Sequence, residues 1–169
     1  MHMLIDRNGH VPDAWVRLSA DTADMSVDVP MLMPLAEWRA NRDRWLARAP
    51  RLGVLLGPAD DPAEIASDFG ALSLIAVDFP SFTDGRGYST ARLLRERYGW
   101  RGELRAVGEV LRDQLFLLAR CGFDTFALAD GQPMDEAVAA FSDFSETYQS
   151  AVDRGPLFAR RGATSGEPA

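Results

Sequence analysis

Short apolar segments alternate with amphipathic segments along most of the chain, and this pattern restricts the fold more than any other feature. The apolar segments RLGVLLG, ALSLIAVDF, ELRAVG and DTFALA start at residues 51, 71, 103 and 124. Helix-like segments follow them, such as EVLRDQLFLLARCG, in which Leu111, Leu115 and Leu118 share one face. Continuous apolar strands that alternate with amphipathic helices are typical of βα units and a mostly parallel sheet.

The number of these units limits the size of the sheet. Four units occupy roughly 100 residues, whereas a complete eightfold barrel needs about 250. We therefore expect an α/β fold with a small open, mostly parallel sheet of about four βα units. Such a sheet is either half-barrel-like or doubly wound, and the pattern alone leaves both arrangements open.

The first 32 residues have a different pattern and predict a β-rich extension. Asn8 and Gly9 lie between apolar runs, which indicates a hairpin. The segments DAWVRL and MSVDVP predict further short strands. Residues 1–32 are therefore expected to precede the α/β units as an N-terminal extension.

The α/β domain is predicted to span residues 33–152. It opens with a helix over residues 34–49, because Pro34 suits the first turn of a helix. Asp61 is expected to cap a second helix that begins at Pro62. Residues 153–169 are rich in Gly, Pro, Arg and Ser and predict a loose tail.

The composition excludes several classes of protein. It is that of a soluble globular chain, with 47% hydrophobic and 25% charged residues. No apolar run approaches the roughly 20 residues that cross a bilayer, and the first ten residues lack the apolar core of a leader. We therefore expect a cytoplasmic protein without membrane contact. The single cysteine, Cys121, excludes an internal disulfide, and one Cys with His2 and His10 cannot form an iron–sulfur or ordinary zinc site.

The charge distribution bears on the partners. A net charge of −7 argues against nonspecific binding to nucleic acid. Residues 84–120, however, hold eight Arg and only five acidic residues. A basic segment of this kind suits an anionic ligand or an acidic partner surface, and it equally suits solvated helix faces.

The stretch DFPSFTDGRGYS, residues 78–89, is the longest polar loop at an edge where ligands are expected, because parallel α/β folds bind ligands beyond the carboxyl ends of their strands. Asp78 ends an apolar strand and is a candidate general base or Mg²⁺ ligand. Arg86 lies between two glycines and offers two parallel donors to a carboxylate, sulfate or phosphate. The alternative is structural: Asp84 forms a turn, the glycines permit positive φ, and Arg86 pairs with Asp78 or Asp84.

A second loop, GEVLRDQ, contributes further candidates. An inward Arg112–Asp113 pair is either catalytic or a buried bridge between helix and loop. The candidate catalytic residues are Asp78, Asp84, Arg112 and Asp113, and the candidate ligand-binding residues are Thr83, Arg86, Gly87, Tyr88, Ser89, Glu109 and Gln114.

Three motifs carry a resemblance to a known family. The segments DFPSFTDGRGYS, LRAVGEVLRDQ and RCGFDTFAL resemble the bacterial domain of unknown function 934 family, and the similarity runs from about residue 33 to residue 149. Members are commonly described as probable oxidoreductases of sulfite reduction. The resemblance therefore implies a pathway more than a reaction.

Three hypotheses for the function follow. In the first, the protein is an accessory of assimilatory sulfite reduction that supports or delivers electrons to a sulfite reductase haemoprotein. In the second, it is a small βα enzyme or binding protein for a sulfur oxyanion or a carboxylate metabolite. In the third, it is a dimeric scaffold with an exposed Trp100–Arg101 corner at the interface. No dinucleotide fingerprint is present, and a flavin needs no motif that would be visible here, so the sequence leaves the cofactor undetermined.

Overall fold

The structure is a computed structural model that describes residues 3–19, 29–48 and 51–142. Its centre is one eight-stranded sheet with the strand order β2-β1-β8-β7-β6-β5-β4-β3. The strands are β1 (Met3–Asp6), β2 (Gly9–His10), β3 (Val16–Arg17), β4 (Met31–Pro34), β5 (Leu52–Leu56), β6 (Leu72–Phe79), β7 (Glu103–Gly108) and β8 (Thr125–Leu128). Strands β3 to β8 are parallel, and β1 pairs antiparallel with both β8 and β2.

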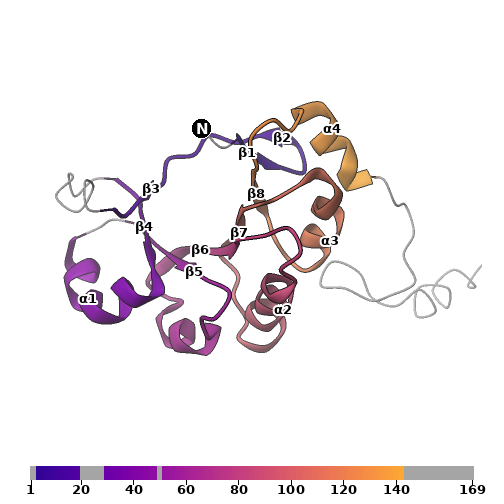
Figure 1. The fold of residues 1–169 in the computed structure, drawn as a ribbon. Coiled ribbons are helices and arrows are strands. Elements are labelled where there is room, and N and C mark those ends of the chain that lie inside the picture. The colour runs from indigo at the N-terminus through magenta and orange to yellow at the C-terminus, as the bar shows by residue number, and fades with distance from the viewer. Residues whose placement is uncertain (1–2, 20–28, 49–50, 143–169) are drawn as a thin grey trace, which may run out of the picture.

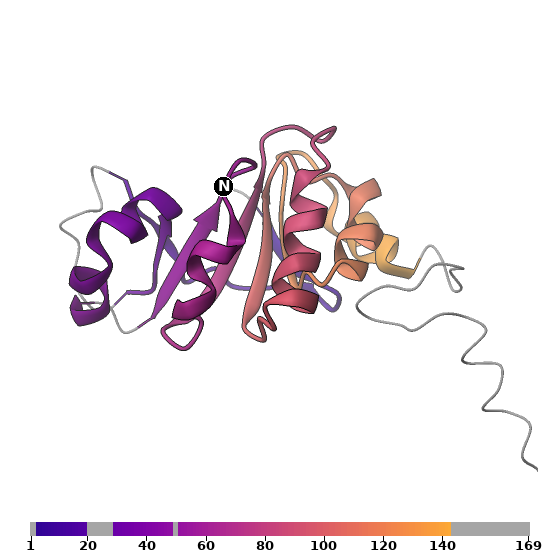
Figure 2. The same cartoon turned by 90° about the horizontal axis from the view of Figure 1, so that it is seen from below.

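The sheet curls into half a barrel, and helices cover its outer face (Figure 1). These elements are α1 (Leu35–Arg48), the 3-10 turn η1 (Pro62–Asp68), α2 (Arg86–Arg92) with its π-turn η2 (Leu93–Arg97), the 3-10 turn η3 (Arg112–Gln114) with α3 (Leu115–Arg120), and α4 (Met134–Ala139) with η4 (Ala140–Ser142). Figure 2 shows α1, η1, α2 and α3 side by side in chain order. A single outer layer of helices decides between the two expected arrangements in favour of the half-barrel.

Alternation along the strands separates two apolar clusters. On β6, Ile75, Val77 and Phe79 join the large core beneath the outer helices. Leu74 and Ala76 point the other way and pack with Leu32 and Leu55 in a small inner cluster. Because successive side chains of a strand point to opposite faces, residues two apart share a face of the sheet. Asp78 therefore belongs to the inner face and Phe79 to the outer face.

The four predicted parallel strands are confirmed as β5, β6, β7 and β8, and the predicted N-terminal strands are present. The extension is not separate, however, because β1, β2 and β3 belong to the same sheet as the βα units. Strand β4 was not predicted from the sequence, because its three buried apolar residues lie between Pro30 and Pro34. Residues 20–28, which include most of MSVDVP, and the tail 153–169 lie outside the described residues.

The predicted helices are largely confirmed. The helix over residues 34–49 is α1, with non-helical angles at Asn41 that mark a kink. Asp61 caps the next segment by accepting a hydrogen bond from the amide of Ala63 at 2.9 Å, and that segment is a 3-10 turn rather than an α-helix. Arg86 to Arg97 form one helical unit that ends in a π-turn.

The chain between β2 and β3 crosses the open side of the curl (Figure 1). Trp15 packs against the inner cluster, and a Cβ on Gly53 would lie only 3.0 Å from its ring. Asp13 forms an ion pair with Arg105 of β7 at 2.9 Å. The N-terminal segment thus packs on the inner face near Gly53 and Arg105.

Candidate functional site

Strand β6 divides the predicted site residues between two faces of the sheet. Asp78 lies on the inner face, in register with Val107 of β7. The next residue, Phe79, points outward, and the ring of Tyr88 packs edge-on against it with centroids 5.4 Å apart. Loop 80–86 and helix α2 therefore continue from the outer side. The residues 78–89, contiguous in sequence, do not converge on one site.

Asp78 occupies an unusual position for a carboxylate. Its Oδ1 lies against Gly108, where an added Cβ would come within 2.8 Å of it and within 2.4 Å of the Phe79 carbonyl. Gly108 also has a φ of +96°, so glycine is required at this point on two counts. Within residues 3–19, 29–48 and 51–142, no group donates a hydrogen bond to Asp78. Burial raises the pKa of Asp78, and the nearby positive charge of Arg17 lowers it by a smaller amount.

A fully bonded charge network lies below Asp78 on the same face. Arg105, which is 3% exposed, donates to Oε1 of Glu103 from Nε at 3.1 Å and from Nη2 at 2.8 Å. Thr125 donates to the same oxygen at 2.7 Å, and Asp13 accepts from Nη1 of Arg105 at 2.9 Å. None of these four residues was predicted from the sequence. The spacing of Glu103 and Arg105, two apart in an otherwise apolar strand, is the signal that would have placed both on one face.

Loop 80–86 is held by its own polar groups. Ser81 and Thr83 share a hydrogen bond between their hydroxyls at 3.0 Å, and the amide of Asp84 donates to the Ser81 carbonyl at 3.0 Å. Arg86 donates to the Asp84 carboxylate from Nε at 2.9 Å and from Nη2 at 2.6 Å. These bonds hold the pKa of Asp84 at about 2. Arg86 thus has the local carboxylate partner that the structural alternative predicted.

Three further ligand-binding candidates contribute to packing at the same loop. A Cβ on Gly87 would lie 2.5 Å from the Phe79 ring, so glycine lets α2 approach the sheet closely. Gln114 donates to the Phe82 carbonyl at 3.0 Å and accepts from the Leu111 amide at 2.9 Å. Burial raises the pKa of the Tyr88 hydroxyl, and its hydrogen bond with Gln114 opposes this shift. Gln114 therefore ties the loop, α2 and α3 together.

The second loop departs from the sequence expectation. Asp113 has a side chain that is 89% exposed, and its oxygen lies 3.5 Å from Nη1 of Arg112. Arg112 instead donates from Nε to the Glu136 carbonyl of α4 at 3.0 Å. The expected inward Arg–Asp pair was wrong, because residues 112–114 form a 3-10 turn that directs Asp113 to solvent. Glu109 and Ser89 are exposed as well.

Phe82 is the most prominent apolar side chain of this edge. It is 58% exposed, the highest value among the large hydrophobic residues that the structure describes. Its backbone is fixed by Gln114, and polar residues flank it on both sides. The loop therefore presents an aromatic ring to solvent from an ordered backbone.

Trp100 does not form the exposed corner that the scaffold hypothesis required. It is only 2% exposed, its ring packs against Phe69 with centroids 4.9 Å apart, and its indole N–H donates to the Glu103 carbonyl at 3.1 Å. In the described part of the chain, no three His, Cys, Asp or Glu side chains gather closely enough to hold a metal ion. None of the described helices combines the length and apolar composition needed to cross a bilayer.

A family model described as a bacterial protein of unknown function (DUF934) matches residues 53–158, which is more than half of the chain. The chain belongs to this family. The matched residues include β5 to β8, with Asp78, Gly108 and the whole of loop 80–86. No curated protein and no solved structure is similar enough to the chain to count as a match. The carboxyl ends of β5 to β8 therefore lie inside the matched region, whereas β3 and β4 lie outside it.

Proposed function

We propose that this protein is an accessory component of assimilatory sulfite reduction that binds a sulfite reductase haemoprotein and supports or delivers electrons to it. The pathway comes from the family resemblance, and the mode of action comes from loop 80–86. The observation that carries the proposal is the exposure of Phe82 on an ordered loop.

An exposed aromatic ring on a fixed backbone suits a binding surface for physical reasons. Burial of a Phe side chain against a partner contributes about 2 kcal/mol from the hydrophobic effect. The loop is already hydrogen-bonded through Ser81, Thr83 and Asp84, so little further backbone ordering is needed on binding. Aromatic residues are enriched at the buried centres of protein interfaces, and polar groups form the rim.

The arrangement around Phe82 matches that description. Beside it, the exposed side chain of Arg86 pairs with the largely covered carboxylate of Asp84, and this charged pair supplies a polar rim. Cys121 is buried, so its thiol is not placed to react with a partner's disulfide. We therefore place the accessory role in docking rather than in thiol exchange.

Direct binding to the purified sulfite reductase haemoprotein of the source bacterium tests the proposal. The wild-type protein should bind, and Phe82→Ser should weaken the dissociation constant by about tenfold or more. The matched control is Leu93→Ser, which removes another exposed apolar side chain, 37% exposed in the π-turn η2. It should leave binding unchanged.

Two results would contradict the proposal. The proposal is wrong if the wild-type protein does not bind the reductase. If wild type and Phe82→Ser bind equally well, loop 80–86 is not part of the interface. Sedimentation of the same variants tests the scaffold alternative. A dimer that dissociates on Phe82→Ser would make a second copy of the chain the occupant of this surface.

A further inference from the structure

The Asp78 carboxylate has a cost to folding that no protein group offsets by hydrogen bonding. It is partly buried at the end of a central strand, and none of the groups in the described ranges donates to it. Buried polar groups in native proteins are nearly always hydrogen-bonded, and an exception calls for an explanation. Carboxylates whose pKa is shifted by burial gather at functional sites.

The position of Asp78 agrees with a ligand-binding role. It lies at the carboxyl end of β6, where open α/β sheets bind their ligands. Beside it on the inner face, Val107 of β7 and Ala127 of β8 have small side chains, and Gly57 follows β5. The charged groups below it, Arg105 and Glu103, are already bonded to each other. By contrast, Asp78 has no hydrogen-bond donor among the described residues.

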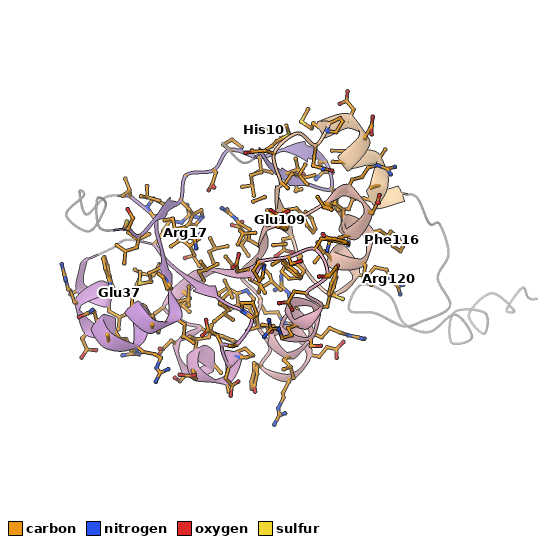
Figure 3. All side chains as sticks on the ribbon, in the orientation of Figure 1. His10, Arg17, Glu37, Glu109, Phe116 and Arg120 are labelled. Carbon is orange, nitrogen blue, oxygen red and sulfur yellow. The ribbon has the colours of Figure 1, made fainter. Side chains whose placement is uncertain are left out.

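Arg17 supplies the second charge of this rim. It pairs with Leu32 in the parallel register of β3 and β4, and Leu32 belongs to the inner cluster. Arg17 therefore faces the same side of the sheet as Asp78, and it lies near enough to lower the pKa of Asp78. In Figure 3, Arg17 lies at β3 and Glu109 lies just after the end of β7. The inner rim thus combines a hydrogen-bond acceptor with a positive charge.

We propose that the inner face at the carboxyl ends of β3 and β6 binds a small organic acid that carries a hydroxyl or amino group. The carboxylate or sulfonate of the ligand pairs with Arg17, and its hydroxyl or amino group donates to Asp78. Arg17 disfavours a simple amine or a metal cation, and Asp78 disfavours an anion that has no donor. This site is independent of loop 80–86 and stands whether or not Phe82 binds the reductase.

A thermal-shift panel tests the two-point recognition. L-serine, lactate and L-cysteate contain both an anion and a donor, whereas acetate and methanesulfonate contain only the anion. At least one compound of the first group should raise the Tm by about 5 °C when it is present at 100 times its Kd, and the second group should not. Isothermal titration with that compound then gives its Kd for the wild type.

Variants assign the effect to the two residues. Asp78→Asn and Arg17→Gln should each weaken the Kd by about tenfold or more, because each removes one charged contact. Asp84→Asn and Arg86→Gln change the same residue types on the outer loop and should leave the Kd unchanged. Asp78→Asn removes a charge that burial disfavours, so it is expected to fold. The proposal is overturned if no compound of the first group binds, or if binding persists in Asp78→Asn.

Discussion

Asp68 and Asp78 are ten residues apart, at the end of η1 and at the end of β6. The carboxylate of Asp68 is hydrogen-bonded by its neighbours, whereas that of Asp78 accepts no hydrogen bond from the described residues. Asp68 is 7% exposed and accepts from the indole N–H of Trp38 at 2.9 Å and from Arg42 at 2.9 and 2.6 Å. The hydrogen bonds with Arg42 are the main reason that its pKa is lowered. Asp78 has no donor among the described residues, and burial raises its pKa.

This difference separates a buried, bonded carboxylate from a partly buried one to which no described residue donates a hydrogen bond. Asp68 joins η1 to α1 on the outer side of the sheet, so its bonds stabilise the packing of those two elements. The carboxylate of Asp78 accepts no hydrogen bond from the described residues, and its partial burial disfavours the charged form more than Arg17 favours it. A residue that opposes stability without a compensating contact is more readily explained by function than by structure. Substitutions at bonded and unbonded charges should therefore change the free energy of unfolding in different ways.

The largest effect is expected at Arg105, which represents the bonded case on the inner face itself. Arg105→Ala should lower the free energy of unfolding by about 3 kcal/mol, because it leaves Glu103 half-buried without its cation. Urea denaturation measures the loss. The double variant Glu103→Leu/Arg105→Met removes both charges and should recover much of it. If Arg105→Ala alone leaves the free energy of unfolding unchanged, the hydrogen bonds of Arg105 do not stabilise the fold.

A smaller loss is expected at Asp68. Asp68→Asn should lower the free energy of unfolding by about 2 kcal/mol at pH 7, since the side chain loses its charge-assisted hydrogen bonds. The pKa of Asp68 is lowered in the folded state, so its contribution is present above its ordinary value of 3.8 and disappears as the pH falls below that value. Wild type and Asp68→Asn should therefore converge in acid. A difference that stays constant with pH would contradict the ionic role.

The sequence predicted the parallel part of the fold because its strands are nearly continuous apolar runs. It missed β4 because three apolar residues between two prolines resemble a linker as much as a strand. The curl of the sheet and the joining of the N-terminal strands to β8 depend on pairings between distant residues, such as Met3 with Leu128. Such pairings cannot be inferred from the hydrophobic pattern of short sequence segments.

For the site, the sequence located Asp78 at a strand end but could not tell which face it occupies relative to loop 80–86. Alternation alone separates Asp78 from Phe79, and the consequence is visible only once the helices are known to cover the outer face. Arg17 was not identified, because its relation to Asp78 arises from the curl of the sheet between β3 and β6. Asp113 was misplaced because a 3-10 turn replaced the expected helical turn.

Asp78→Asn should change the free energy of unfolding in the opposite direction to Asp68→Asn. The pKa of Asp78 is raised in the folded state, so the carboxyl group destabilises the protein as the pH rises above its ordinary value of 3.8, and this penalty is absent below that value. The neutral, isosteric Asn should raise the free energy of unfolding at pH 7, by an amount that solvent limits because Asp78 is only partly buried. Urea denaturation at pH 7 and at pH 3.5 checks both the gain and its disappearance in acid. A loss of stability at pH 7 would show that Asp78 is a structural residue like Asp68.

The smallest effect is expected at Arg86, which tests whether a closely paired carboxylate stabilises the fold when its arginine partner is exposed. Arg86 is bonded to Asp84 as closely as Arg42 is to Asp68, at 2.6 Å in both cases, but its side chain is 62% exposed. Solvent screens such a pair, so Arg86→Ala should change the Tm by no more than about 2 °C. The pKa of Asp84 is about 2, so the pair keeps its charge to low pH, and this small difference should be lost only as the pH falls toward that value. A larger change in Tm would mean that the Arg86–Asp84 pair supports the fold although the Arg86 side chain is exposed.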